Sequence, residues 1–397
     1  MRRQIGSARE RAKGSGRWEL RWYSKRGDKY YTKTVSARNE TEARKLLGRV
    51  VAEFESCEDR KKPESLTVAE MLERFLTDYA TQNLRRTTLQ RYTAIIRNDI
   101  VPSLGSVQAE RLSVVDISDY FSWALEHGRK DGSGGLSART VHHIHSLLRK
   151  AYSLGVKRHW VSRNPTKDVD PPTPDNVEMQ ALAVDQLVEL LELCRGTKYE
   201  MPITLGAFTG MRRGEILGLK WDCIDFERRT ITIIRTLEEV KEGLFLGDTK
   251  TRSSRRTIPI ADTLTAALTE HQNRQGEQKR YLGELYTDQD FVCAEEDGRP
   301  MRPKNLTTAF RQLADGMGLF GVRFHDLSRH TPATIMLENG ENATVVQEHL
   351  GHANYGITMD IYSHVSVRMS REAAERYDRT VRDAKTKYDA RRRKSVE

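Results

Sequence analysis

Cysteine is scarce in this sequence, and its few residues show no paired spacing. Cys57, Cys194, Cys223 and Cys293 are scattered over the 397 residues. Disulfide-rich secreted domains and zinc ribbons need closely spaced cysteine pairs, so the pattern argues against both classes. Such sparse usage is typical of a protein that stays in a reducing cytoplasm.

Long apolar segments are also missing. No apolar run approaches the roughly eighteen residues that a membrane-spanning helix requires. The first residues, MRRQ, do not open the apolar core of a signal peptide. We therefore expect a soluble, cytoplasmic protein without a membrane partner.

Acidic residues are outnumbered by basic ones. Lys and Arg total 66 against 56 Asp and Glu, a formal net charge of +10. A basic surplus of this size favours a polyanionic partner such as nucleic acid, although it also serves solubility. The chain length predicts two or three domains, each large enough to bury its own core.

Residues 1–60 have the pattern of a small basic domain. Apolar and polar residues alternate over 18–23, as in a half-buried strand, and a second strand is expected over 29–35 after a polar turn. A helical pattern follows from Asn39. We expect one exposed sheet face to read a DNA groove, the alternative being a solvated basic surface. The candidate residues on that face are Arg21, Tyr23, Lys29 and Lys33.

Residues 64–170 predict a helical domain. Thr67 and Glu70 form a capping-box pattern at its first helix. The proline-rich sequence DPPTPD at 170–175 marks a boundary with the next domain. Basic residues at one edge would clamp a duplex backbone, or alternatively form surface salt bridges. The candidates for this contact are Arg85, Arg86 and Arg91.

Residues 180–397 carry the residue types that suit phosphodiester chemistry. His325 and Arg329 are four residues apart and share one face of a helix, and Tyr362 lies in a short apolar run. Arginine binds two phosphate oxygens at once, histidine exchanges protons near neutral pH, and tyrosine can act as a covalent nucleophile. A buried tyrosine with capping histidines is the structural alternative. Zinc is a weaker alternative, because His349 and His352 lack cysteine partners and a metalloprotease spacing, so we expect no metal.

Five motifs then occur in one order along the C-terminal part. They are TGMRRGEILGLKW (209–221), TKTRSSRRTIPI (249–260), HDLSRHTPAT (325–334), EHLGH (348–352) and MDIYSHV (359–365). Together they resemble the tyrosine recombinases, in particular the integrases of phages and integrative elements. The resemblance implies a mainly α fold with small antiparallel β-sheets (α+β). It also implies an arm-type DNA-binding domain at 1–60, a helical core-site domain at 64–170 and a catalytic domain at 180–397, with a third strand in the first of these.

The resemblance also implies the catalytic residues and the reaction. The nucleophile would be Tyr362, which attacks a DNA phosphorus to give a 3′-phosphotyrosyl link without ATP, metal or other cofactor. Glu215 would hold an arginine in place, and Arg213 would be structural, as would His330 and His364. Lys220 and Arg252 are the alternatives for the catalytic lysine. The full implied catalytic set is Arg212, Lys250, His325, Arg329, His352 and Tyr362.

One departure from the family pattern concerns the second arginine. The family has two residues between its histidine and arginine, whereas Ser328 adds a third here. If His325 begins a helix, the pair still shares one face. Pro332 also departs from the common residue, and we expect it in a first helical turn, where its missing N–H is not needed.

The implied partners are double-stranded DNA attachment sites in a bacterial host cell, an excisionase and a host DNA-bending protein. We expect a monomer in solution and a homotetramer in the synapse. A helical tail over 366–397 is expected to dock on a neighbouring protomer, the alternative being a solvated helix that touches its own domain. Two other functions stay open: a type IB topoisomerase that relaxes DNA, and a non-catalytic DNA-binding regulator.

Overall fold

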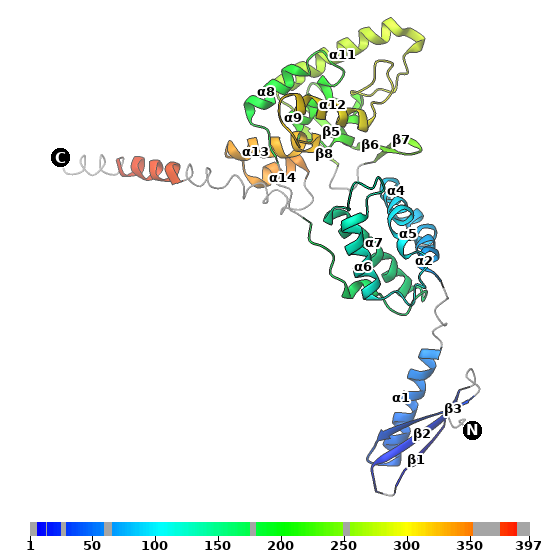
Figure 1. The fold of residues 1–397 in the computed structure, drawn as a ribbon. Coiled ribbons are helices and arrows are strands. Elements are labelled where there is room, and N and C mark those ends of the chain that lie inside the picture. The colour runs from blue at the N-terminus through cyan, green and yellow to red at the C-terminus, as the bar shows by residue number, and fades with distance from the viewer. Residues whose placement is uncertain are drawn as a thin grey trace, which may run out of the picture. The chain divides into compact units, whose positions relative to one another are not determined.

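The structure, a computed structural model of the chain, is mainly helical (Figure 1). The structure describes residues 6–12, 14–24, 29–58, 66–174, 180–248, 255–351 and 374–386. The chain divides into two compact units, Met1–Asn176 and Val177–Glu397. No helix among the described residues is long and apolar enough to cross a membrane.

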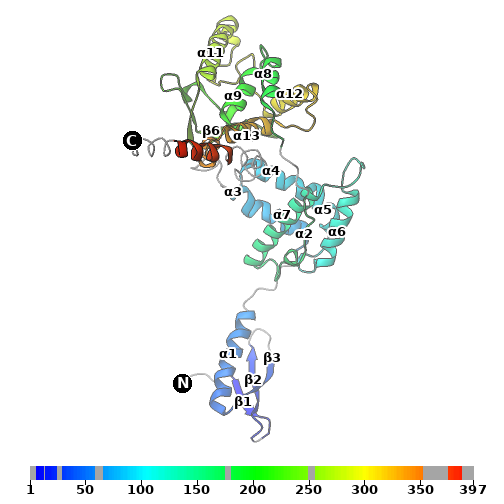
Figure 2. The ribbon, with the colours of Figure 1, turned by 90° about the vertical axis from the view of Figure 1, so that its left-hand side faces the viewer.

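The first unit begins with a three-stranded antiparallel sheet in the order β1-β2-β3. The strands are β1 (Gly6–Glu10), β2 (Arg17–Ser24) and β3 (Lys29–Ser36), and helix α1 (Glu40–Glu58) follows (Figures 1 and 2). Leu20 and Trp22 of β2 are buried together with Ala43, Leu47 and Val51 of α1. The third strand that the family resemblance implied is therefore present as β1.

The strand register corrects the expected position of Lys33. Lys33 pairs with Leu20, whereas Arg21 pairs with Thr32 and Tyr23 with Tyr30. Directly paired residues point to the same face of an antiparallel sheet, so Lys33 shares the face of buried Leu20. Its side chain is nevertheless exposed. The prediction that Lys33 shares a face with Arg21 and Tyr23 was wrong.

The rest of the first unit is a helical assembly with a core of its own. Thr67 caps its first helix: its side chain accepts from the Glu70 N–H at 3.2 Å, and Glu70 accepts from the Thr67 N–H at 2.8 Å. The predicted capping box is thus confirmed. The elements are α2 (Val68–Phe75), the π turn η1 (Leu76–Ala80), α3 (Thr81–Asn83), α4 (Arg86–Ile95), the π turn η2 (Ile96–Ile100), α5 (Val101–Leu104), α6 (Val114–His127), α7 (Ala138–Lys157) and the 3-10 turn η3 (Pro165–Asp168).

The second unit combines helices with two small antiparallel sheets, β4-β5-β8 and β6-β7. Its strands are β4 (Ile224–Asp225), β5 (Thr230–Ile233), β6 (Arg235–Val240), β7 (Gly243–Asp248) and β8 (Arg256–Pro259). Its helices and turns are α8 (Val184–Leu193), α9 (Glu200–Thr209), α10 (Arg213–Leu217), η4 (Trp221–Cys223), α11 (Asp262–Leu282), η6 (Gly283–Leu285), α12 (Pro303–Gly316), the π turn η7 (Asp326–His330), α13 (Thr331–Glu338) and α14 (Ala343–Leu350). A further helix covers 374–386 within the predicted tail.

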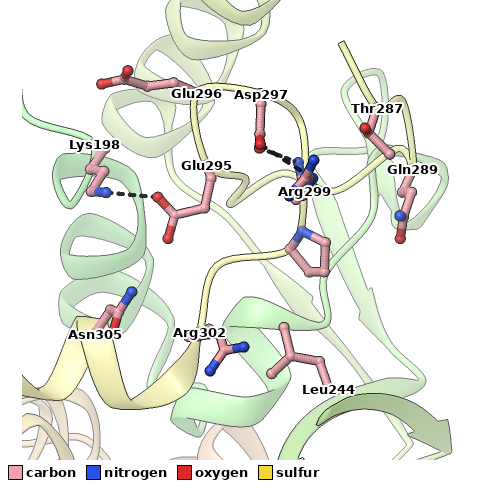
Figure 3. A pocket seen from close by; sticks show the side chains of 11 residues that line it. Lys198, Leu244, Thr287, Gln289, Glu295, Glu296, Asp297, Arg299, Arg302 and Asn305 are labelled. Carbon is pink, nitrogen blue, oxygen red and sulfur yellow. Dashed lines mark hydrogen bonds and ion pairs between the residues drawn. The ribbon is translucent and has the colours of Figure 1, made fainter. Parts of the chain in front are cut away.

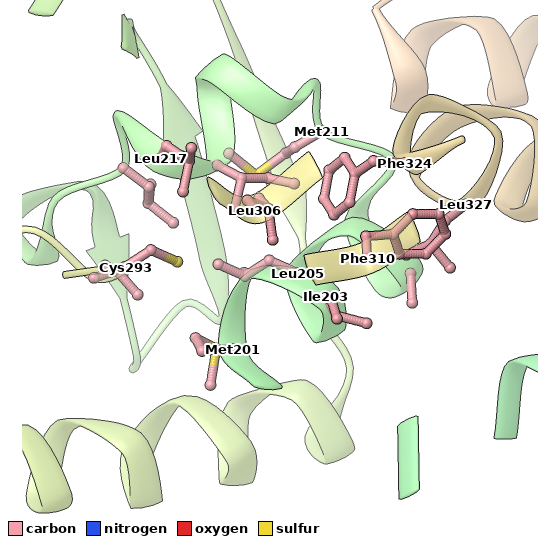
Figure 4. Packing of buried hydrophobic residues seen from close by; sticks show 14 of the residues in the cluster. Met201, Ile203, Leu205, Met211, Leu217, Cys293, Leu306, Phe310, Phe324 and Leu327 are labelled. Carbon is pink, nitrogen blue, oxygen red and sulfur yellow. The ribbon is translucent and has the colours of Figure 1, made fainter. Parts of the chain in front are cut away.

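Helix α9 is the central element of the second unit. It is apolar on nearly every side, which is the pattern of a helix buried in a core. Its residues Met201, Ile203 and Leu205 pack among Met211 and Phe310 and the other buried side chains in Figure 4. Because α9 is fixed on most sides, the loop at its C-terminal end has a defined position.

Candidate active site

The loop after α9 positions the first predicted arginine. Gly210 ends the helix with φ +65°, and a Cβ at this position would come within 2.1 Å of Leu350 Cδ2. Glycine is therefore required both for the left-handed conformation and for the close approach of α14. Arg212 comes next as the cap of α10, where its backbone N–H donates to Glu215 Oε2 at 3.0 Å.

Glu215 lies buried between two arginines. Its Oε1 accepts from Arg212 Nη1 at 2.8 Å, and its Oε2 accepts from Arg256 Nη2 at 3.1 Å. Burial by itself would raise the pKa of Glu215, but the charges of Arg256 and Arg212 and the Arg212 N–H outweigh it. The pKa of Glu215 is held below its usual value, so the carboxylate stays ionised. The predicted contact between Glu215 and an arginine is confirmed.

Arg329, the second predicted arginine, is almost completely buried. Its side chain lies on the π turn η7, and the residue is only 1% exposed. Its Nη1 donates to the carbonyl oxygen of Gly210 at 2.6 Å and also to that of Leu350. Burial, followed by the charges of Arg212 and Arg256, lowers the pKa of Arg329 to about 9, so it is still charged at neutral pH.

The three guanidiniums give the site a strong positive potential. Arg212, Arg256 and Arg329 face one carboxylate, Glu215, which leaves two positive charges uncompensated among the described residues. A desolvated cationic group of this kind favours an anion such as a phosphodiester. Arg212, 40% exposed at its side chain, gives the cluster access to solvent.

His325 lies beside this cluster at the start of η7. The residue as a whole is exposed, but the protein around its imidazole ring removes part of the water that would stabilise the charged form. This desolvation, followed by the nearby charges of His330 and Arg329, lowers its pKa to about 4. It is therefore neutral at pH 7 and able to accept a proton. Asp326 beside it is buried and binds Arg323 through both oxygens, at 2.8 and 2.9 Å, which fixes the start of the turn.

The extra residue Ser328 is accommodated by the π turn. The N–H of Thr331 donates to the carbonyl of Asp326, five residues back. A π turn holds one more residue than an α turn. The backbone continues in helical conformation from η7 into α13, so Pro332, the second residue of α13, lies within a longer helical stretch and not at its free start.

The structure thus describes three of the six predicted catalytic residues: Arg212, His325 and Arg329. Arg212 and Arg329 both donate to carbonyls at the end of α14, and His325 lies close enough to Arg329 for that charge to lower its pKa, so the three lie in one region. The other three, Lys250, His352 and Tyr362, lie outside the described residues, as do Arg252 and His364.

Of two further arginines, Arg213 lies outside the cluster and Arg256 belongs to it. Arg213 points to α12, where its Nη1 donates to Thr307 Oγ1 at 2.5 Å, in keeping with the structural role expected for it. Arg256 was missed by the sequence analysis. The sequence feature that could have indicated Arg256 is its place at the end of a basic run, but the run contains other basic residues from which spacing does not distinguish it.

The pocket of Figure 3 differs from the arginine cluster in having paired charges. In the pocket of Figure 3, Lys198 pairs with Glu295 at 2.7 Å and Arg299 with Asp297 at 3.3 Å, so its charges are compensated. Among the residues that the structure describes, no cluster of His, Cys, Asp and Glu could hold a metal ion.

Comparison with known proteins agrees with this geometry. Residues 180–369 match the model of the phage integrase family, and residues 67–122 match the N-terminal SAM-like domain of phage integrases. The chain belongs to the phage integrase family, the tyrosine recombinases. This recombinase is a DNA breaking and rejoining enzyme, and nothing in the comparisons favours a topoisomerase.

Its relatives extend over most of the chain. A XerC-like tyrosine recombinase of Caldanaerobacter subterraneus is 26% identical and covers 89% of this chain and 97% of its own length. The ICEBs1 integrase of Bacillus subtilis is 22% identical, covering 89% and 93%. Among solved structures, the Tn1549 transposon integrase superposes with a TM-score of 0.65 at 21% identity, over 79% of this chain and 100% of that one. These likenesses confirm the predicted α+β recombinase fold.

Proposed function

We propose that this recombinase cuts and rejoins DNA through Tyr362, and thereby integrates and excises a phage or another mobile element. The observation that carries the proposal is the meeting of Arg212 and Arg329 at the end of α14. Each donates to a carbonyl there, to Gly351 and Leu350 respectively. The next residue in the sequence is His352, and Tyr362 follows shortly after it.

Each predicted residue has a role in the proposed reaction. The Tyr362 oxygen attacks phosphorus, the bond from phosphorus to the 5′ oxygen breaks, and a proton passes to that oxygen from Lys250. Arg212 and Arg329 stabilise the charge of the pentacoordinate phosphorus. Since tyrosine has a reference pKa near ~10, the cationic cluster also lowers the cost of ionising it.

The two histidines complete the site. His325, neutral at pH 7, takes up the tyrosine proton during cleavage and returns it during rejoining. His352 donates to a phosphate oxygen. Because the phosphotyrosyl link conserves the energy of the phosphodiester, rejoining needs no cofactor.

The helical part of the first unit, at 64–170, is proposed to bind core-site DNA. Arg86 and Arg91 are exposed on α4, and Arg85 precedes them. Burial and the charges of Arg91, His142 and Arg139 lower the pKa of His143, so basic groups of α4 and α7 lie close together. A basic surface built from two helices suits contact with a duplex backbone.

The sheet at 1–60 is proposed to bind separate, arm-type sites. The Arg21 guanidinium lies 4.4 Å from the centre of the Tyr30 ring, and Tyr23 lies 5.1 Å from the same ring. Arg21 and Tyr23 therefore share an outer face of mixed basic and aromatic character. Lys33 is proposed to reach DNA only from the opposite face or the strand edge.

The related structures support the proposed assembly. Lambda integrase has been solved as a dimer bound to a core site, with a TM-score of 0.55, and as a tetramer bound to a Holliday junction, with a TM-score of 0.52. We propose that this chain likewise acts on DNA attachment sites as a homotetramer and is a monomer when free. An excisionase and a host DNA-bending protein are proposed as further partners.

Replacement of the nucleophile tests the proposal. Tyr362→Phe should bind a nicked attachment-site duplex like the unaltered protein and form no covalent adduct with it. Tyr281→Phe is the matched control, since Tyr281 is 89% exposed on α11. A covalent adduct that persists in Tyr362→Phe would overturn the assignment.

A further inference from the structure

Three arginines hold three successive carbonyl groups at the end of α14. Arg256 Nε donates to the His349 carbonyl at 3.2 Å, Arg329 Nη1 to that of Leu350, and Arg212 Nη2 to that of Gly351 at 3.1 Å. The last carbonyls of a helix have no partner within it and carry its negative partial charge. The arginine N–H groups supply the missing hydrogen bonds, and their positive charge offsets the negative partial charge. The helix end is therefore fixed to the arginine cluster.

Arg256 is the member of this group with no role in the proposed reaction. It is the first residue of β8, and its side chain is 8% exposed. A Cβ on Gly351 would come within 2.8 Å of Arg256 Cδ, and Gly351 has φ +65°, so glycine is what lets the arginine pack against the chain here. Burying a guanidinium is costly unless it is paired and hydrogen-bonded.

The contacts of Arg256 join two parts of the site. Its Nη2 donates to Glu215 at 3.1 Å, while its Nε donates to the end of α14. Glu215 in turn holds the guanidinium of Arg212 at 2.8 Å. Arg256 Nη1 has no hydrogen-bond partner within the described part of the chain. A planar fork can make two such contacts at fixed angles, whereas a lysine ammonium on a flexible stem is held less well.

We propose that Arg256 is a positioning residue for DNA cleavage. It fixes Glu215, and through Glu215 the guanidinium of Arg212, against the end of the helix that precedes His352 and Tyr362 in the sequence. The inference rests on the proposed roles of Arg212 and Tyr362. Without Arg256, the guanidinium of Arg212 loses its fixed position against the end of α14.

The test compares two adjacent arginines on a nicked attachment-site duplex. Arg255 is the control, because its ion pair with Asp248 is exposed, at 55% and 76% of the two side chains. Arg256→Ala should lower the single-turnover rate of adduct formation at saturating DNA by about 10- to 100-fold, since small misplacement of a reacting group has costs of that order. Its Kd for the duplex should stay close to that of Arg255→Ala.

Two further measurements separate positioning from general damage to the fold. Methylguanidinium should restore part of the rate of Arg256→Ala, and methylammonium should not. Arg256→Lys should be slower than the unaltered protein and faster than Arg256→Ala. If Arg256→Ala does not fold, Arg256→Lys carries the comparison of rate and Kd, because it keeps the buried charge without the fork.

A double variant tests whether Arg256 acts through Arg212. In an Arg212→Ala background, the further loss caused by Arg256→Ala should largely disappear, since the group it positions is gone. Losses that multiply in full, a loss confined to Kd, or a rate equal to that of Arg255→Ala would each overturn the proposal. Tyr362→Phe, run on the same duplex, shows whether the proposed function itself has failed.

Discussion

Replacing Glu215 with alanine should destabilise the second unit severely. The carboxylate is 4% exposed and bonds Arg212 at 2.8 Å and Arg256 at 3.1 Å. Arg212, 40% exposed, can turn toward water, but Arg256, 8% exposed, would stay buried without its counter-charge. Removing one partner of a buried pair costs about 3–5 kcal/mol. We expect a loss of this size in the free energy of unfolding.

Amide hydrogen exchange of peptides from α9 and α10 in the full chain is the suitable assay. A chain of several units does not unfold in one step, whereas exchange reports the stability of each region. The control is Asp248→Ala, which breaks the exposed pair with Arg255 and should cost about 0–1 kcal/mol. If Glu215→Ala lost no more protection than this control, the buried pair would not stabilise the site.

The same pair predicts a dependence on pH. The pKa of Glu215 is lowered in the folded chain from a reference value of 4.5. The unfolded chain then binds more protons as the pH falls below that value, so the contribution is full above it and is lost in acid. The difference in stability between the unaltered protein and Glu215→Ala should therefore shrink below pH 4.5. A difference that grew in acid would contradict the assigned charge.

Three further predictions concern catalysis and DNA binding. Arg212→Ala and Arg329→Ala should each slow adduct formation by about 10²–10³-fold. Arg213→Ala, which loses a contact with Thr307 of α12, should lose far less; the reverse order would move the first catalytic arginine by one residue. At subsaturating DNA, the cleavage rate should not show a His325-dependent step between pH 6 and 8, because the pKa of His325 is about 4; a step near ~6.5 that vanishes in His325→Asn would contradict this. A chain that begins at Leu66 should keep core-site binding and cleavage and lose a separate class of sites in footprinting. If this chain and the full chain protect the same DNA, the sheet does not bind separate sites.

The position of Arg212 was predictable because local sequence determines it, whereas Arg329 was assigned from the family motif and is held by Gly210 and Leu350, which are distant in the sequence. A glycine before Arg212 and a glutamate three residues after it are helix-end signals that are visible in one dimension. The structure uses both, in the left-handed turn at Gly210 and in the capping contact with Glu215. The family motifs then selected these arginines from among their neighbours.

Arg256 and Lys33 were misjudged because their positions depend on contacts across the chain. Arg256 ends a run that also contains Arg252 and Arg255, and spacing alone does not identify Arg256 as a buried residue. Its burial follows from the pairing of β8 with β5 and from the approach of α14. The face of Lys33 depends on the register of β2 and β3, and a shift of one residue reverses it.

The extra Ser328 shows how a departure in sequence can leave the surrounding helix intact. One residue inserted into an α-helix would turn all that follows by about 100°. The wider turn η7 absorbs it instead, so Ala333 and Leu337 of α13 remain in the core. Gly206 of α9 makes room for the turn, since a Cβ there would come within 3.2 Å of Ser328 Cβ. The insertion is therefore contained between the exposed His325 and the buried Arg329, and the guanidinium of Arg329 still reaches the end of α14.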